Sequence, residues 1–345
     1  MAKRIQISTD SGVTWNTFPG DKGEQHITGT AIDDTIFGQD YKSSQTGMLN
    51  FNLACNGFYK GFAGYVATVK ATGSPTAFTA EATTLVSGKT YKITNAVKNI
   101  WNRLVPPTVK DNGVTVTGTN IESIDYLFGQ VTFASGYTVT GPITFDGSYL
   151  PSTQIASANT FTLTQTAATI DTSDFISAQS NGGYMDSDYG LKTVSLQLKG
   201  FFNVSNGFLA AVQGRGEVVV EISPDGSGNA VARGFMKPVT MDQSGNVGAL
   251  EEQDITYQLS VPDQADVISP FTWSFPSNST INAAVKAALT AWTGNTIIEV
   301  NYLEDGTTGH KGSAVITEAT LAGGLDVMNE FSFKFQGSGA PVAFP

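Results

Sequence analysis

Two stretches of the chain show the same alternation of apolar and polar residues. The first, 217–260, contains EVVVEIS, an Asp-Gly pair, VARGFMKPVTM and ITYQLS; the second, 296–336, contains TIIEVNYL, an Asp-Gly pair, SAVITEATL and EFSFKF. Alternation with a period of two is typical of half-buried strands, and Asp-Gly between such runs is a hairpin signal. Each stretch is therefore predicted to form strand, turn, strand, strand.

A second pair of segments aligns without a gap. GMLNFNLACNGFY begins at Gly47 and GLKTVSLQLKGFF begins at Gly190, and glycine, leucine and phenylalanine positions coincide. Repeated segments of this size indicate a duplicated structural unit. We take the following residues as the signature of the repeat: Gly47, Leu53, Gly57, Phe58, Gly190, Leu196, Gly200, Phe201, Gly234 and Gly312.

Helices are expected just before the two strand-rich stretches, over Asn203–Gln213 and Thr280–Trp292. In the second helix, alanines occupy one side and bulky apolar residues the other, which is typical of a helix that packs on a sheet. Ser279 and Thr280 suit its N-terminus and Gly294 its C-terminus.

Residues of about 70 to 153 differ in character and are bounded by the linkers ATGSPTA and SYLPST. They contain a possible short helix over Asn95–Arg103, an Asn112-Gly113 hairpin signal, and the predicted strands IDYLF, QVTFA and PITFDGSY. We read this segment as an inserted small β-rich domain.

The expected domain organisation follows from these segments. Residues 1–69 with 268–345 would close into one discontinuous unit, 154–267 would form a second unit, and 70–153 would be the insertion. A purely sequential arrangement is the alternative. The predicted fold class is mainly β: duplicated sandwich or barrel units, each with a flanking helix, plus the inserted domain.

The charge balance excludes general nucleic-acid binding. The formal net charge is −11, from 30 acidic and 19 basic residues, whereas affinity for phosphates needs clustered Lys and Arg. No run approaches the roughly 20 apolar residues of a membrane span, so no membrane partner is expected. The single cysteine, Cys55, rules out an intramolecular disulfide framework and falls in an alternating strand.

No constellation of catalytic residues is present in the sequence. His26 and His310 are the only histidines, no Cys-x-x-Cys or G-x-S-x-G occurs, and the glycine-rich segments join strand to strand. Acidic pairs lie in turn-like contexts, with weak calcium binding at Asp186 and Asp188 as the main alternative to solvated loop charge. We predict no catalytic, cofactor-binding or metal site, and no enzyme.

One local segment matches a known sequence motif closely. The segment from Ser8 to Trp15, STDSGVTW, resembles the Asp-box S-x-D-x-G-x-T-W of sialidase-type propellers, in which it is a structural turn. Propellers carry several copies, whereas this chain has one and lacks an arginine cluster for a sialic acid carboxylate. We expect Asp10, Gly12 and Trp15 to form a hairpin turn.

Larger segments resemble a known family. RIQISTDSGVTWNTFPG, DDTIFGQDYKSSQTGMLNFNLACNGFYKGFAGYVATVK, YKITNAVKNIW, IDYLFGQVTF and PITFDGSYLP are similar to major tail tube proteins of long-tailed, non-contractile (siphovirus-type) bacteriophages. The resemblance implies units whose sheets join into a tube wall of stacked rings, with the insertion outside. Two units per chain would give trimeric, pseudo-hexameric rings. It also implies that there are no catalytic residues.

The resemblance carries further expectations. The virion tail would be the location, with assembly in the bacterial cytoplasm. The tape-measure, tail terminator and distal tail proteins would be partners, and DNA would pass without specific binding. An acidic lumen would repel the polymer. We expect the polar loops at 17–46 and 177–190 to reach the adjacent ring.

Two other functions compete with the tube subunit. One is a carbohydrate-binding or carbohydrate-hydrolysing virion protein, which would need aromatic residues on an exposed platform. Its candidates Trp15, Trp101, Trp273 and Trp292 fall beside strand or helix patterns, which favours packing. The other is an immunoglobulin-like decoration protein, with the insertion as its adhesive module.

Overall fold

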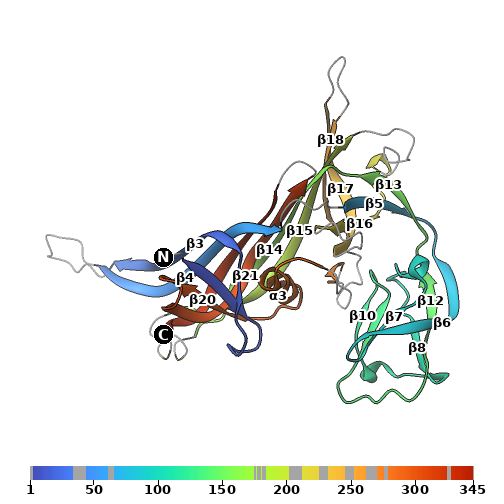
Figure 1. The fold of residues 1–345 in the computed structure, drawn as a ribbon, viewed down its shortest axis with the longest axis horizontal. Helices are drawn as coiled ribbons and strands as arrows, with labels where there is room; N and C mark the ends of the chain where they lie inside the picture. Colours follow the sequence, from blue (N-terminus) through green and yellow to red (C-terminus); the bar gives the residue numbers. More distant parts are fainter. Residues whose placement is uncertain are drawn as a thin grey trace. The chain divides into compact units, whose positions relative to one another are not determined.

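The computed structural model describes residues 3–33, 44–60, 66–174, 176, 180, 184–201, 212–224, 232–244, 252–261, 270–275, 279–324 and 328–344. The chain folds into two compact units. Unit 1 comprises Met1–Gly64, Phe161–Leu196 and Ser277–Pro345; unit 2 comprises Tyr65–Thr160 and Gln197–Pro276. The predicted mainly β class is confirmed (Figure 1). The domain boundaries expected from the sequence stay a prediction.

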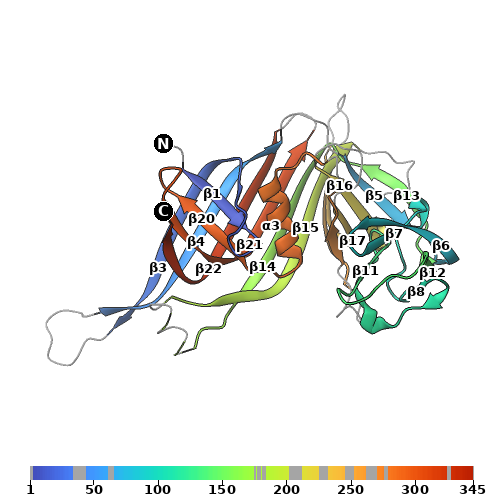
Figure 2. The same ribbon diagram turned by 60° about the horizontal axis from the view of Figure 1, so that its bottom comes forward.

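Unit 1 is a set of antiparallel strands with a helix on one side (Figure 2). Its elements are β1 (Arg4–Ser8), β2 (Asn16–Thr17), β3 (Gly20–Asp33), β4 (Ser44–Lys60), β14 (Thr160–Asp171), β15 (Ser187–Phe201, which continues into unit 2), α3 (Ala283–Thr293), β20 (Ile298–Leu303), β21 (Gly309–Gly324) and β22 (Asn329–Phe344). Strand β22 lies between β21 and β4, and β3 follows β4. The first half of β21 pairs with β20, which pairs with β1. Both ends of the chain thus share one sheet.

The core of unit 1 follows from the alternation along β22. Phe331, Phe333 and Phe335 are buried, and all three rings lie within 6.0 Å of the ring of Phe18. The intervening residues face the other way, as a period-two strand requires. The layers close where β3 approaches β1, since a β-carbon at Gly23 would lie 3.1 Å from Ile5 Cδ1.

Helix α3 packs on β1, β2 and β21. It begins at Ala283, and the side chain of Asn282 caps it by accepting a hydrogen bond from the Ala284 amide at 2.8 Å. The expectation that Ser279 and Thr280 start the helix is wrong, because the backbone becomes helical only after Asn282. The predicted end at Gly294 is confirmed.

Unit 2 contains a further set of antiparallel strands. Its strands are β5 (Val66–Thr72), β13 (Ser152–Ser157), β16 (Val218–Ser223), β17 (Ala232–Ser244), β18 (Glu252–Leu259) and β19 (Phe271–Trp273). The order is β13, β5, β16, β17, β18, and β19 pairs with β17. Strands β16 to β18 and β20 to β22 each form the predicted consecutive antiparallel triplet. Most of the predicted Asn203–Gln213 helix lies outside the described residues.

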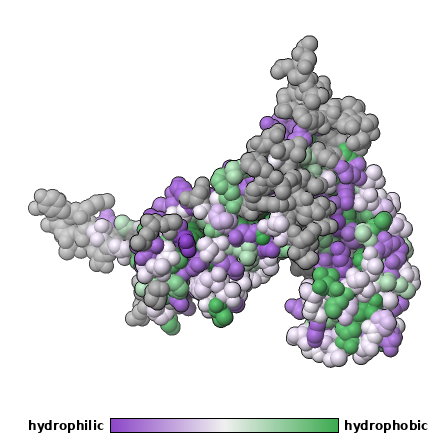
Figure 3. Space-filling view, in the orientation of Figure 1, coloured by the Kyte–Doolittle hydropathy of each residue, from purple (hydrophilic) through white to green (hydrophobic). Residues whose placement is uncertain are grey.

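Unit 2 also carries the inserted segment, here called the module, which forms a seven-stranded sheet in the order β10, β11, β7, β6, β12, β8, β9. The strands are β6 (Thr76–Ser87), β7 (Thr90–Ile93), β8 (Thr108–Asp111), β9 (Val114–Thr115), β10 (Ile121–Asp125), β11 (Gln130–Phe133) and β12 (Ile143–Tyr149). The hairpin at Asn112 and Gly113 is confirmed, with φ of 50° and 80°. Figure 3 shows hydrophobic residues on the visible face of the module. The large apolar side chains that are exposed on the module are Leu85, Val86, Val97, Leu104, Val105 and Val114.

Two local predictions in the module are wrong. The strand expected at IDYLF ends at Asp125, because the Asp125 carboxylate accepts hydrogen bonds from the amides of Leu127 and Phe128 and turns the chain. The helix expected over Asn95–Arg103 is a single 3-10 turn, Ala96–Lys98. Beyond it, the Trp101 amide bonds the Tyr126 carbonyl at 2.7 Å, so a tertiary contact replaces a helical one.

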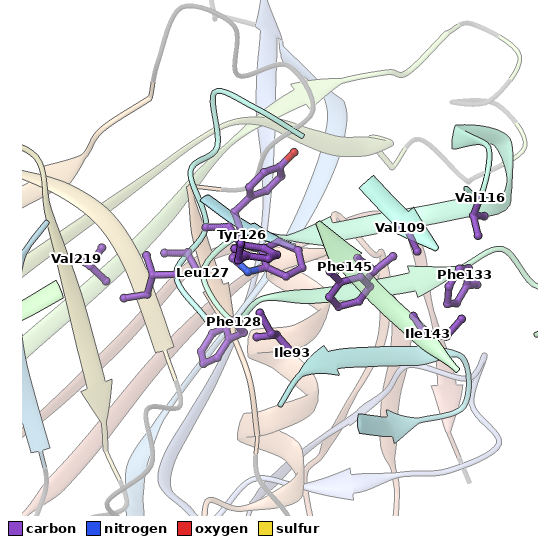
Figure 4. Close-up of a cluster of buried hydrophobic side chains, with 14 of the residues drawn as sticks. Ile93, Val109, Val116, Tyr126, Leu127, Phe128, Phe133, Ile143, Phe145 and Val219 are labelled. Atoms are coloured by element: carbon purple, nitrogen blue, oxygen red, sulfur yellow. The ribbon is translucent and has the colours of Figure 1, made fainter. Parts of the chain in front are cut away.

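The module is fastened to the sheet of unit 2. Val219 and Phe235, from β16 and β17, belong to the same buried cluster as the module's own core, and Figure 4 shows Val219 beside Leu127. Arg233 on β17 donates to the Leu127 carbonyl at 2.7 Å. In the opposite direction, Arg103 of the module donates to the Ser260 carbonyl at 2.7 Å. The module therefore docks through apolar burial and two reciprocal arginines.

Candidate functional site

One face of unit 1 is polar over four neighbouring strands. Because strand residues alternate between faces, the residues between the buried positions of β3, β4, β22 and β21 all point to the side opposite the core. This polar face consists of Lys22, Glu24, His26, Asn52, Ala54, Asn56, Phe58, Glu318, Thr320, Ala322, Glu330, Ser332, Lys334 and Gln336. Apart from Ala54, Phe58 and Ala322, every member is polar or charged.

The register arranges these side chains in rows across the strands. Thr320 lies opposite Ser332, Ser332 opposite Asn56, and Asn56 opposite Lys22. The Ser332 hydroxyl donates to Asn56 Oδ1 at 2.8 Å. Cross-strand pairs of this kind stabilise the sheet by roughly 0.2–1 kcal/mol each.

Both lysines on the polar face are ion-paired. Lys334 Nζ lies 2.7 Å from Glu318, and Lys22 Nζ lies 2.6 Å from Glu24. Glu330 adds a further carboxylate, so the carboxylates of the face outnumber its lysines by one. These pairs are exposed and contribute little stability, but among the side chains described on this face they leave a phosphate group no unpaired lysine to bind.

On the core side, two glycines admit an aromatic ring. A β-carbon at Gly337 would lie 2.0 Å from Phe51 Cε1, and one at Gly312 would lie 2.8 Å from Phe51 Cζ. Phe51 of β4 therefore reaches over β22 to β21. The repeat residue Gly234 has a similar setting in unit 2, since a β-carbon there would lie 3.0 Å from Phe271 Cδ2.

The other repeat residues are distributed over β4 and β15. Leu53, Gly57 and Leu196 are buried, Phe58 is 36% exposed on the polar face, and Gly47 lies near the start of β4. Gly190, Gly200 and Phe201 all belong to β15. At Gly190 a β-carbon would lie 3.1 Å from the Ala168 carbonyl of β14, so this glycine permits a close strand approach.

The Asp-box segment forms a compact loop between β1 and β2. Asp10 Oδ1 accepts hydrogen bonds from the Ser8 hydroxyl at 2.6 Å and from the Thr14 amide at 2.8 Å. The Ser8 hydroxyl is the largest cause of a lowered pKa for Asp10, about 2. Gly12 has φ of 83°, and Trp15 packs beneath it and against Phe344 at 5.7 Å. The residues of the motif therefore form hydrogen bonds with one another, and Trp15 packs against the rest of unit 1.

Strands β3 and β4 extend beyond the core as an arm. Their pairing continues to Asp33 and Ser44, and the described residues from His26 to Asp33 are exposed where their side chains are described, with Ile27 52% exposed. Figures 1 and 2 show this hairpin projecting from the rest of unit 1. Residues 34–43 lie outside the described residues. Among the described residues, β3 pairs with β4 alone, so its outer edge is open.

A small cavity lies at the other end of β3. Its volume is about 140 Å³, and it is lined by Lys3, Arg4, Ile5, Thr17, Phe18, Gly20, Lys22, Gly23 and Cys55. The floor is apolar and the rim is basic. Cys55 is buried, as its place in an alternating strand predicts.

The tryptophans form no exposed platform. Trp101, Trp273 and Trp292 are at most 8% exposed, and Trp15 is half-buried beneath its turn. Within the described parts of the chain, no group of three or more His, Cys, Asp or Glu is placed to hold a metal ion. His26 and His310 each lie 3.7 Å from a glutamate. The described helices include none that is long and apolar enough to cross a membrane.

The sequence did not point to the ion pair Glu318–Lys334, to the arm or to the basic rim. Charges scattered along strands that lie far apart in sequence become neighbours only through the register. The one available signal for the arm is the unusual length of the polar segment 17–46.

Comparisons with known proteins assign no family to the chain. No protein-family model matches the chain, and no curated protein matches its sequence. A chain from the tail of an empty gene transfer agent particle, refined helically with C6 symmetry, is 15% identical, with a TM-score of 0.28 over 36% of this chain and 87% of that one. A chain from the virion of the native gene transfer agent particle has the same identity, TM-score and coverage of this chain, and 89% of it is covered. A likeness this small carries no argument about fold or function.

Proposed function

We propose that the chain is a structural subunit of a siphovirus-type phage tail tube, which polymerises as stacked rings into a hollow conduit for DNA. The observation that carries this proposal is the polar face of β3, β4, β22 and β21. It is a broad sheet surface with apolar side chains behind it and hydroxyls, amides and paired charges in front. In this proposal the polar face lines the bore.

The chemistry of the polar face suits a surface that DNA must pass. A conduit that gripped phosphates would stall the polymer, because each phosphate held by Lys or Arg adds to the binding free energy. Lys22 and Lys334 are already paired with carboxylates, and Glu330 makes the face weakly acidic. Mild repulsion then keeps DNA mobile in the bore.

The open edge of β3 supports closure into a ring. Exposed strand edges invite further pairing, and cyclic assembly removes them. With two related units per chain, three chains would complete a pseudo-hexameric ring. In this arrangement 1–69 with 268–345 would form one tail-tube unit, 154–267 the other, and the module would decorate the outside.

Stacking of rings is assigned to the segments 17–46 and 177–190. The arm belongs to the first. In the second, 177–179 and 181–183 lie outside the described residues, and β15 begins at Ser187. The ends of the tube would meet the tail terminator, distal tail and tape-measure proteins. Assembly would take place in the bacterial cytoplasm and end in the virion.

Negative-stain microscopy of the purified protein tests the proposal. Long hollow filaments of uniform diameter, with threefold-related rings, are expected. A monodisperse monomer at high concentration, or a capsid-bound decoration, would contradict it. Deleting residues 34–43 should leave a folded subunit, by circular dichroism, that no longer polymerises; normal tubes from this deletion would contradict the stacking role.

A further inference from the structure

The cavity at the start of β3 carries an excess of positive charge in a chain whose net charge is −11. Three cations, Lys3, Arg4 and Lys22, line it. Lys22 is paired with Glu24. Among the described residues neither Lys3 nor Arg4 forms an ion pair, both are exposed, and Lys3 lies 5.9 Å from the ring of Tyr302. Two cations at the rim are therefore available to a small anion.

A hydroxyl group adds a further donor to this rim. Thr17 lines the cavity, and its Oγ1 accepts a hydrogen bond from Gln6 Nε2 at 2.9 Å, so the hydroxyl proton of Thr17 is left to be donated. A carboxylate only accepts hydrogen bonds, and its two oxygens match the planar fork of an arginine. The donors at the rim, from Lys3, Arg4 and Thr17, therefore suit a carboxylate.

Below the rim the cavity is apolar and small. Ile5, Phe18 and Cys55 are at most 4% exposed, and Gly23, which lies opposite Cys55 in the register of β3 and β4, contributes no side chain. A volume of about 140 Å³ is similar to that of apolar cavities that take up a molecule the size of benzene. An aromatic ring suits this floor, because it gains from contact with the ring of Phe18 and with a polarizable sulfur atom.

Backbone hydrogen bonds fix the walls of the cavity. The Phe18 amide donates to the Ile5 carbonyl at 3.0 Å, which ties the segment before β3 to β1. Strand β1 also pairs with β2, and β3 pairs with β4 on the other side. A site whose walls are already ordered loses little conformational entropy when a ligand enters, so even a small ligand can bind measurably.

We propose that the cavity lined by Lys3, Arg4, Ile5, Thr17 and Phe18 binds a small aromatic carboxylic acid. One ring of about the size of benzene fills the floor, and the carboxylate lies at the rim against Lys3 and Arg4. The inference goes beyond the proposed tube and does not depend on it, because every lining residue belongs to unit 1 of a single copy.

Calorimetric titration of the full-length protein with sodium benzoate tests the site. Benzoate is ionised at about pH 7, and we expect one site per chain with a dissociation constant of about 1 mM or lower. Benzyl alcohol keeps the ring without the charge, and acetate keeps the charge without the ring. Each should bind about tenfold more weakly than benzoate or worse, because it lacks either the charged hydrogen bonds or the apolar contact.

Variants of the rim and of the floor separate the two halves of the site. K3A/R4A should weaken benzoate binding about tenfold or more and leave the affinity for benzyl alcohol unchanged. The matched control K199A/K237A removes the same charge at two exposed lysines elsewhere and should bind benzoate as the wild type does. Cys55→Leu places a larger side chain in the floor and should weaken both ligands. Thermal unfolding checks that each variant is folded.

The results that would overturn the site are distinct from those that bear on the tube. The proposal fails if benzoate shows no saturable binding to the wild type, or if K3A/R4A binds it as tightly as the wild type. An equal loss of affinity in K199A/K237A would show that net charge attracts the acid, and would overturn the site as well. A folded Cys55→Leu variant with unchanged benzoate affinity would place the ring elsewhere. Benzoate binding by a wild type that forms no tubes would support the site and count against the tube alone.

Discussion

The ring of Phe51 lies against the backbone of Gly337, so that a β-carbon at position 337 would be 2.0 Å from Cε1. The same ring also covers Gly312. Phe51 of β4 therefore contacts the two neighbouring strands of the sheet, β22 and β21. The backbone beneath the ring must come close, and only a glycine allows that.

Gly337→Ala should destabilise unit 1 by about 3 kcal/mol, because the methyl group forces the ring or the strand to move. Urea unfolding measures the loss. Gly136→Ala is the matched control, since nothing lies within 4 Å of a β-carbon there. In a Phe51→Ala background, Gly337→Ala should cost much less. An equal cost in both backgrounds would show that the ring is not the obstacle.

Arg233→Ala should loosen the module. The guanidinium is buried, pairs with Glu221 at 2.6 Å, and lies 4.7 Å from the ring of Phe128. Removing one partner of a buried pair costs about 3 kcal/mol or more. We expect faster proteolysis between the module and β17 as well as lower stability. Lys334→Ala, which breaks an exposed ion pair, should cost about 1 kcal/mol at most. A similar loss of stability from Arg233→Ala and Lys334→Ala would show that the buried ion pair is no more important than the exposed one.

Acid should weaken the Asp10 turn. The folded-state pKa of about 2 lies below the ordinary value of 3.8, so between these pH values the unfolded chain binds more protons than the folded one. The stabilisation is therefore complete above about pH 4 and is lost as the pH falls through 2. The difference in Tm between wild type and Asp10→Asn should shrink over that window. A difference that stays constant down to pH 2 would contradict the role of the charge.

Asn282→Ala should cost about 1 kcal/mol, since it removes the N-cap of α3. Ser279→Ala is the informative control. The Ser279 hydroxyl is buried and has no hydrogen-bond partner among the residues that the structure describes, so its removal should leave the unfolding midpoint almost unchanged. A larger loss of stability from Ser279→Ala than from Asn282→Ala would contradict the assignment of Asn282 as the N-cap.

Thr320→Lys with Ser332→Lys tests the bore. The two positions face each other on the polar face, and the substitutions place cations there without carboxylate partners. Tubes should still form, but short double-stranded DNA should bind them with a strong salt dependence. Unchanged DNA binding by intact variant tubes would argue that the polar face lies elsewhere than in the lumen. Ala283→Lys with Thr290→Lys, at two exposed positions of α3, adds the same charge away from the polar face and is the matched control.

The strands could be predicted because their alternation is a local property of the sequence. The errors arose where a side-chain hydrogen bond to the backbone or a distant contact overrides the preference of the apolar pattern. Tyr126 to Phe128 look like strand residues, yet they fold inward as a turn because Asp125 binds two amides of that segment. Similarly, Trp101 leaves the expected helix to join a core formed with Phe145.

The polar face and the basic rim of the cavity were harder to predict from the sequence than the strands. Nothing near Glu318 indicates that Lys334 will face it, because that pairing depends on the register and on a bulge between Ile316 and Glu318. The basic rim combines the start of β1 with the start of β3, which meet only when the layers close. Sequence patterns set the faces of strands, whereas register decides which side chains become neighbours.

Unit 1 is built from both ends of the chain, with β1 beside β20 and β4 beside β22. A ribosome therefore releases β20 and β22, the partners of β1 and β4, only after β5 to β19 have been made. Contacts this distant in sequence form slowly, and until then the edge of β4 opposite β3 remains unpaired. A chain interrupted before β20 would lack the completed sheet of unit 1, so the first strands stay incomplete until β20 to β22 have been made.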